Sequence, residues 1–229
     1  MNKLKTILIA ACSLVLVSVG GIANADSSNF AGPYVGVTGS GYGIELGGEA
    51  RSTRNNAAGE TSLEHDKVSI GKVTPVMGIE AGYALPLGAG FLLDVGGAYH
   101  SGEAKIDHEG DDSDTLRQVS FKIDDLVTMY IAPTLVLSDT SALYVKMGVT
   151  SADIGVSGDI TTPGNLEGEL WGIGTRTQLD SGIFVRTEAG YTEYNAISVT
   201  GKGTTIQTST TYSADPTSAY GTVSLGFRF

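Results

Sequence analysis

Apolar residues alternate with small or polar residues along much of this 229-residue chain, and the alternation continues to the last residue. Near the C-terminus, Val223, Leu225, Phe227 and Phe229 fall on one side of an extended chain, because strand side chains point alternately to opposite faces. The termini of soluble proteins are usually polar and frayed. A final apolar stripe that includes the last residue therefore faces either a protein core or lipid.

The same period-two alternation predicts eight strands. In each of them, one face carries the larger apolar side chains and the other carries glycine and polar residues. We predict these strands over residues 34–44, 73–84, 91–101, 121–137, 143–151, 169–179, 183–194 and 219–229. After the N-terminal apolar run, no segment of the sequence is long and apolar enough for a membrane-spanning helix.

The connections between the predicted strands alternate in length. Four are long and polar, at residues 45–72, 102–120, 152–168 and 195–218, and the three between them are short. This asymmetry is typical of outer-membrane barrels, in which closure of the sheet also removes its edges. We therefore predict an all-β fold: a single eight-stranded antiparallel transmembrane β-barrel with short periplasmic turns and four longer extracellular loops. The alternative is a secreted barrel or sandwich with its apolar face turned inward.

The N-terminal end has the pattern of a secretory signal peptide: a basic start, an apolar run, and small residues before a cleavage site at Ala25. We predict a signal peptide over residues 1–25 and one barrel domain over residues 26–229. A competing interpretation places a lipidated N-terminus at Cys12. The apolar run continues past that residue, which favours cleavage after Ala25.

Removal of residues 1–25 leaves 12 basic and 25 acidic residues, a formal charge of −13, and no cysteine. A face that binds phosphates needs a basic patch, so we expect no nucleic-acid partner. Without cysteine, disulfide bonds do not contribute to stability.

Seven charged residues are predicted to point into the barrel: Glu80, Asp94, Lys146, Arg176, Arg186, Glu188 and Arg228. A narrow interior of low dielectric constant tolerates charges only when they are paired. Three acidic residues against four basic ones are nearly balanced, so most of the excess negative charge lies in the loops. We interpret this network as a structural plug of salt bridges and bound water. The alternative is a gated pore, in which re-pairing of an arginine or lysine opens a small ion path.

Catalytic and metal-binding residue types are not grouped in a way that predicts a site. His65 and His108 fall in predicted polar loops. His100 and Ser101 are neighbours on a strand and face opposite ways, so they cannot form a nucleophile–base pair. The acidic stretch at residues 108–114 lacks the ligand spacing of a calcium loop. We expect no enzymatic activity, no cofactor and no metal.

Proline and phenylalanine residues give local predictions. Pro75 and Pro133 fall inside predicted strands, where each removes a ladder donor. We expect a bulge at Pro133 and a position above the membrane for Pro75. Phe91 and Phe184 are expected near the level of Phe229, in an aromatic girdle on the periplasmic side.

The chain resembles the small outer-membrane β-barrel proteins, the group that contains the opacity-type surface proteins and the barrel domain of OmpA-like proteins. The resemblance rests on the signal-peptide pattern, on AGPYVGV at the first strand, on GIEAGYALPLG, and on the aromatic-ended SLGFRF. It covers essentially all of residues 26–229 and is specific for architecture rather than activity. It implies the outer membrane of a Gram-negative bacterium as the location.

The resemblance also implies partners. In that family the terminal aromatic strand is the signal read by the barrel-assembly machinery, which here assigns a C-terminal assembly signal to Val223, Leu225, Phe227 and Phe229. The other expected partners are outer-membrane lipids and lipopolysaccharide, and the expected state is a monomer. We expect no peptidoglycan-binding domain after the barrel.

These features predict an integral outer-membrane protein with a structural or surface-interaction role, adhesin-like in character. The alternative function is a narrow porin that conducts small ions or solutes through a charged, gated lumen. The last long loop is rich in threonine and serine at residues 200–218, and we expect it to extend the last two strands as a hairpin beyond the membrane.

Overall fold

The computed structural model describes residues 27–55, 61–108, 119–157, 165–202 and 209–229. Short 3-10 helices, η1 (Ser27–Asn29) and η2 (Asp180–Gly182), accompany a molecule that is otherwise built of strands. The long strands that form its wall are β1 (Gly32–Asn55), β2 (Thr61–Gly88), β3 (Phe91–Ser101), β5 (Val119–Ser138), β6 (Ser141–Ser157), β7 (Leu166–Gln178), β8 (Ile183–Tyr194) and β10 (Ser209–Arg228). Among the described residues, no helix has the length and apolar character needed to cross a membrane.

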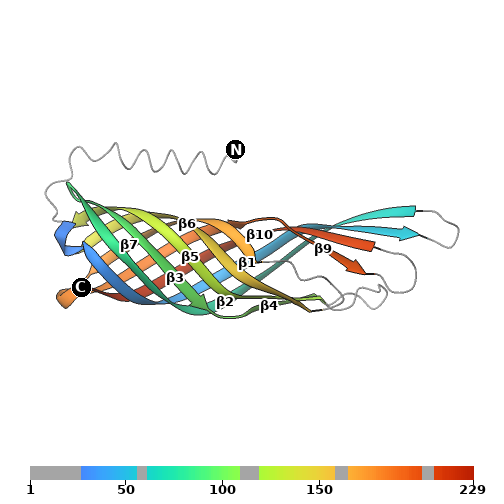
Figure 1. Ribbon diagram of the computed structural model, residues 1–229, viewed down its shortest axis with the longest axis horizontal. Helices are drawn as coiled ribbons and strands as arrows, with labels where there is room; N and C mark the ends of the chain where they lie inside the picture. The colour runs from blue at the N-terminus through green and yellow to red at the C-terminus, as the bar shows by residue number, and fades with distance from the viewer. Residues whose placement is uncertain (1–26, 56–60, 109–118, 158–164, 203–208) are drawn as a thin grey trace.

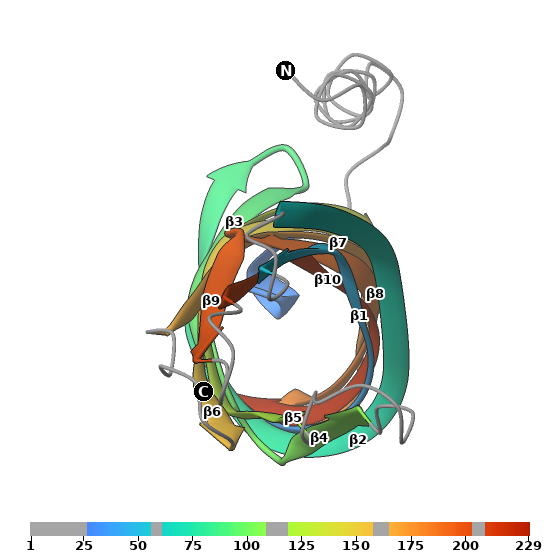
Figure 2. The same cartoon turned by 90° about the vertical axis from the view of Figure 1, so that its right-hand side faces the viewer.

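The wall closes on itself. Long strands that follow one another in the chain pair antiparallel, and β1 pairs with β10 from Tyr34–Arg228 to Thr53–Ser209. Figure 2 shows the result, viewed along the barrel, as a closed ring of strands with η1 inside its outline. Each wall strand thus has a neighbour on both sides, and the predicted eight-stranded antiparallel barrel is confirmed.

Short turns gather at one end of the barrel, together with η1 and the C-terminus (Figure 1). Ala89–Gly90 joins β2 to β3, and Asp139–Thr140 joins β5 to β6. Gly90 has a φ of 77°, a conformation that favours glycine. The backbone N–H of Phe229 donates to the carbonyl of Pro33 at 3.0 Å, which ties the last residue to the first wall strand. We call this end the inner end.

At the opposite, outer end the strands run further than the alternation predicts. β1 and β2 stay paired to Asn55–Thr61. β4 (Ala104–His108) pairs with β5, and β9 (Ile197–Lys202) pairs with β10 as the predicted hairpin. The placement of His65 and His108 in loops is therefore wrong, because antiparallel backbone pairing between neighbouring strands continues there without apolar alternation.

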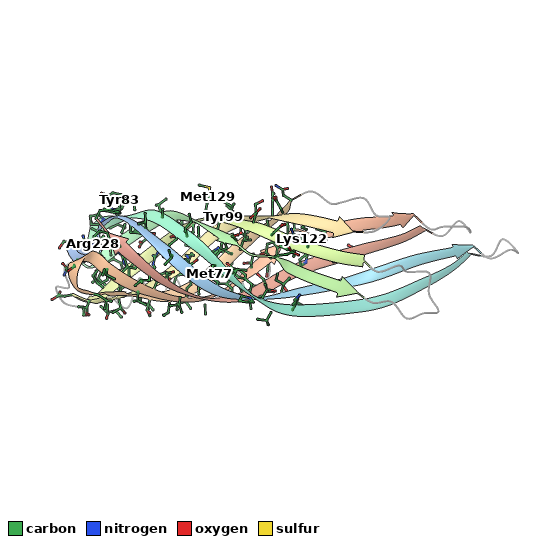
Figure 3. The ribbon with its side chains drawn as sticks, turned by 90° about the horizontal axis from the view of Figure 1, so that it is seen from below. Met77, Tyr83, Tyr99, Lys122, Met129 and Arg228 are labelled. Carbon is green, nitrogen blue, oxygen red and sulfur yellow. The ribbon has the colours of Figure 1, made fainter. Side chains whose placement is uncertain are left out.

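Apolar side chains cover the outer surface of the wall. Val73, Met77 and Met129 are 76%, 75% and 67% exposed. Figure 3 shows side chains such as Tyr83 and Met129 projecting away from the ribbon. The alternation therefore predicts correctly which face of each strand is outside.

The prolines lie within the ladders. Pro75 pairs with Gly41. Pro133 leaves a gap in the β5–β6 pairing, but the pairs on either side of it keep one register, so the bulge expected there is wrong. The two register shifts of this pairing lie elsewhere, between Val136 and Ser138 and between Asp124 and Val127, where Asp125 has a φ of 51°.

Candidate functional site: the barrel interior

Two apolar clusters occupy the two ends of the interior. The inner cluster is buried near the short turns and comprises Phe30, Tyr34, Ala84, Leu92, Val136, Ala142 and Phe184. The outer cluster comprises Tyr42, Ile44, Ile123, Ala152, Leu166, Leu170 and Tyr220. Buried charged residues lie at and between these clusters, and we call them the charge belt: Glu80, Asp94, Lys146, Arg176, Arg186 and Glu188.

Arg186, on β8, lies at the centre of the charge belt. Its Nη1 is 3.4 Å from Oε2 of Glu80, and its Nη2 is 3.4 Å from Oδ1 of Asp94. Nη1 also donates to the hydroxyl of Tyr130 at 3.4 Å. One guanidinium group therefore joins β2, β3, β5 and β8 across the lumen. A planar group with five donors in fixed directions suits such a bridge.

Arg176, on β7, lies at the level of the inner cluster. Its Nη1 is 3.7 Å from Oδ1 of Asp94, while Oδ2 of Asp94 accepts from the hydroxyl of Thr134 at 2.7 Å. The guanidinium carbon lies 4.3 Å from the ring centroid of Phe184. Phe184 is fully buried here, so its expected place in the lipid-facing aromatic girdle on the periplasmic side is wrong. It follows the same alternation as Arg186, which points inward.

Lys146 and Glu188 form the tightest ion pair of the belt, with 2.6 Å between Nζ and Oε2. Glu188 also accepts from the hydroxyls of Tyr144 at 2.8 Å and Tyr220 at 3.0 Å. Nζ of Lys146 lies 4.2 Å above the ring of Tyr130. The carboxylate thus has three donors, which offset the cost of its burial.

Tyrosines complete the belt, and the sequence analysis did not single them out. Arg186 lies 5.0 Å from the ring centroid of Tyr34 and 4.8 Å from that of Tyr144. The hydroxyls of Tyr34 and Tyr130 are 3.0 Å apart. The signal in the sequence is alternation: Tyr34, Tyr130 and Tyr144 share the inward parity of Gly36, Thr128 and Lys146, each two positions away on the same strand.

Arg228 lies apart from the charge belt. It is half-buried at the inner end, where its Nη1 donates to the carbonyls of Ala31 at 3.0 Å and Ser28 at 3.4 Å. The amide of Asn29 donates to the carbonyl of Asp139 at 3.4 Å. These bonds hold the N-terminal segment across the barrel mouth with Phe30 fully buried beneath it. Arg228 therefore fastens a plug rather than pairing with a carboxylate of the lumen.

The C-terminal stripe lies on the outer surface. Val223, Leu225, Phe227 and Phe229 are all exposed on the wall. The rings of Phe227 and Phe229 meet edge to face, with centroids 5.2 Å apart.

Histidine and acidic groups give no sign of a catalytic or metal centre in the part of the chain that the structure describes. His100 is buried inside and Ser101 is exposed, so the two diverge. No group of three or more His, Cys, Asp or Glu side chains among these residues could hold a metal ion. Most of the acidic stretch, residues 109–114, lies outside the described residues.

A closed wall with an apolar outer surface and a charged interior is the architecture of an outer-membrane barrel. The family model for the outer membrane protein beta-barrel domain matches residues 12–227. The chain belongs to this family. Its location is therefore the outer membrane of Gram-negative bacteria. No curated protein matches the sequence.

The chain is similar to several solved structures at low sequence identity. The attachment invasion locus protein Ail of Yersinia pestis is 11% identical, with 85% of this chain and 99% of that chain covered and a TM-score of 0.42. Neisserial surface protein A is 11% identical, with 87% and 98% covered and a TM-score of 0.48. OprG of Pseudomonas aeruginosa is 12% identical, with 87% and 97% covered and a TM-score of 0.49.

Proposed function

We propose that this protein is a surface-interaction protein of the outer membrane, adhesin-like in character, and that its barrel is a closed structural anchor. The observation that carries the proposal is the filled interior. Arg186 is 2% exposed and bridges Glu80 and Asp94 across the lumen, and Phe30 closes the mouth beneath it. A barrel of about eight strands is only wide enough to be filled by its side chains.

The outer end is then the part that meets a partner. The β1–β2 ladder and the β9–β10 hairpin continue beyond Val73, one of the outermost exposed apolar residues of the wall. Paired strands hold a binding surface in place before the partner arrives, which lowers the entropy cost of association.

The other partners follow from the outer surface. We propose that lipids and lipopolysaccharide cover the apolar wall and that the barrel is a monomer. We also propose that Val223, Leu225, Phe227 and Phe229 form the assembly signal. The exposure of this stripe on the outer face of the last strand supports its recognition.

Hairpin deletion tests the surface role. Removal of residues 197–214 eliminates β9 and its paired segment of β10 while leaving the β8–β10 ladder from Thr217–Glu193 onward. We expect the variant to fold, as read from a heat-modifiable gel shift, and to lose binding of cells to host surface or to neighbouring cells. Unchanged binding by this variant and by a matching deletion of the β1–β2 tip would refute the surface role.

A narrow porin is the second candidate, and the guanidinium distances favour it. The contacts of Arg186 and Arg176 with carboxylates are 3.4 to 3.7 Å long, whereas Lys146–Glu188 is 2.6 Å. Charge-assisted hydrogen bonds are usually about 2.7–2.9 Å long, so the arginines are loosely held and able to re-pair.

Planar-bilayer recording separates the two candidates. The closed anchor predicts no discrete conductance steps from the folded barrel. The porin predicts steps that change with Arg186→Ala and stay the same with Lys122→Ala, which lies outside the belt.

A further inference from the structure

Two small cavities lie in the lumen on the outer side of Arg186. Their volumes are about 20 Å³ and about 30 Å³. A cavity of roughly 10–15 Å³ on this measure already holds one water molecule. Tyr42, His100 and Leu126 line both cavities, which therefore meet at these side chains. We call the one that reaches Glu188 the deep cavity and the one that reaches Asp124 the shallow cavity.

Several of the buried polar atoms that have no hydrogen-bond partner belong to residues that line these cavities. Within the described part of the chain, this holds for both ring nitrogens of His100 and for the hydroxyls of Thr38 and Thr74. Glu80 uses Oε2 for Arg186, while its Oε1 has no partner. All four residues are more than nine-tenths buried. Native proteins satisfy such groups with protein atoms or with ordered water.

The wall of the deep cavity is suited to water. Much of the remaining lining carries hydroxyl groups: Thr128, Thr150, Thr192, Thr222 and Ser224. A hydroxyl both donates and accepts, as water does. Lys146 is paired with Glu188 and Glu80 with Arg186, so the charged groups at the floor balance one another and select no free ion.

The shallow cavity reaches the outer rim. Asp124 lines it, and the Asp124 side chain is 27% exposed. The same carboxylate is 2.7 Å from Nζ of Lys122, whose side chain is 43% exposed. Figure 3 shows Lys122 toward the outer hairpins. Solvent at the rim therefore borders this cavity.

The deep cavity ends at the belt. Tyr144 and Tyr220 bond both oxygens of Glu188 at its floor. Arg186 fills the lumen next to that level, and the inner cluster follows. Among the described residues, no member of the inner cluster lines either cavity.

We infer that the two cavities form one dead-end chamber of ordered water, open toward the outside of the cell and closed at the charge belt. It brings external solvent, and protons with it, to His100 and to the Lys146–Glu188 pair, while the inner half of the lumen stays dry. The titratable and charged side chains that surround His100 in the chamber are Tyr42, Glu80, Asp124, Lys146, Glu188, Tyr194 and Tyr220. The chamber is independent of the surface-interaction role.

Water-edited NMR on the folded barrel in lipid bilayers tests this inference without a substitution. Magnetisation that starts on water reaches only side chains in contact with it. We expect transfer to Thr38, Thr74 and the ring of His100 to be several-fold faster than to Ala84 and Ala142. These two alanines are matched controls, because they are buried inside the same wall within the inner cluster.

A larger side chain at the junction of the two cavities provides a matched variant. In His100→Phe, the larger apolar ring occupies the junction of the cavities, so transfer to Thr38 falls to the level of Ala84 while transfer to Thr74 is kept. Folding is checked by the heat-modifiable gel shift. If the variant fails to fold, the wild-type comparison still decides.

Two results would overturn the inference. Transfer to Thr38 and His100 as slow as to Ala84 in the wild-type barrel means that the outer half is dry. Transfer to Ala84 as fast as to Thr38 means that water passes the charge belt and the chamber has no floor.

Discussion

At the charge belt, each charged side chain has an oppositely charged partner, and aromatic rings lie against Lys146 and the two arginines. In the outer half, the buried polar groups are hydroxyls and one histidine that face small cavities. Arg186 has two carboxylates and three tyrosines as neighbours, whereas His100 has one edge contact with Tyr42, at 5.7 Å between ring centroids. Buried charge requires dense mutual contacts because an unpaired buried charge is far more costly than a neutral group. A neutral polar lining tolerates space and water.

Removal of the Arg186 guanidinium should have the largest effect on the free energy of unfolding. Arg186→Met leaves Glu80 without its ion-pair partner in a buried site. We expect the free energy of unfolding to fall by about 4 kcal/mol. Urea titration followed by the heat-modifiable gel shift measures it, with Lys122→Met as the exposed control. A loss equal to that of the control would contradict the role of the belt.

Truncation of the plug should have the next largest effect. Phe30 is fully buried against the inner cluster and lies 5.7 Å from the guanidinium of Arg176. Phe30→Ala should lower the free energy of unfolding by about 3 kcal/mol, through lost burial and the cavity left behind. The same titration checks it, and Phe30→Leu should lose clearly less. Equal stability of all three chains would show that the N-terminal segment does not seal the mouth.

Replacement of the outer histidine should cost little. His100→Leu removes two unpartnered nitrogens and keeps a side chain of similar size. The free energy of unfolding should stay within about 1 kcal/mol of the wild type, because no protein hydrogen bond is broken. If His100→Leu lowered the free energy of unfolding as much as Arg186→Met does, the outer half of the lumen would be as sensitive as the charge belt, and the comparison would be contradicted.

The smallest effect belongs to the outer rim. Hydrogen bonds to Asp124 and then to Glu103 raise the pKa of Lys122, whose side chain is exposed. Because this pKa is raised, the ion pair contributes to folding stability at pH values below the lysine pKa of the unfolded chain. The contribution is lost as the pH rises through the pKa of Lys122 in the folded protein. Lys122→Ala should therefore leave stability unchanged near neutral pH within measurement, because exposed pairs are screened. A clear loss in the urea titration would place the rim among the stabilising elements.

Alternation of side chains was sufficient to predict the wall. β3 and β8 have the predicted bounds, and the inward placement of Glu80, Asp94 and Arg186 follows from parity alone. Period-two patterning carries this information because a one-residue error would turn every side chain to the wrong face.

Pairing inside the lumen could not be predicted in the same way. Arg186 meets Glu80 and Asp94 across separations of 106 and 92 residues. Which groups meet depends on the stagger between strands and on the tilt of the barrel, and neither is encoded in a single strand.

Phe184 and Arg228 show what a local sequence pattern does not encode. Residue type predicts a place in the aromatic girdle for Phe184, whereas its parity predicts the buried position that it has. Arg228 has inward parity but lies at the end of β10, where the carbonyls of Ser28 and Ala31 are closer than any lumen carboxylate that the structure describes.

The seam between β1 and β10 has a consequence for how the chain folds. Its pairs run from Tyr34–Arg228 to Thr53–Ser209, so every contact in the seam spans most of the chain. Such contacts stabilise the fold only after a long loop has been closed, and the entropy cost of that closure makes them slow to form. Until β10 arrives, β1 presents an open edge that invites pairing with other chains. The barrel therefore passes from two exposed edges to none in one late step, when β10 pairs with β1.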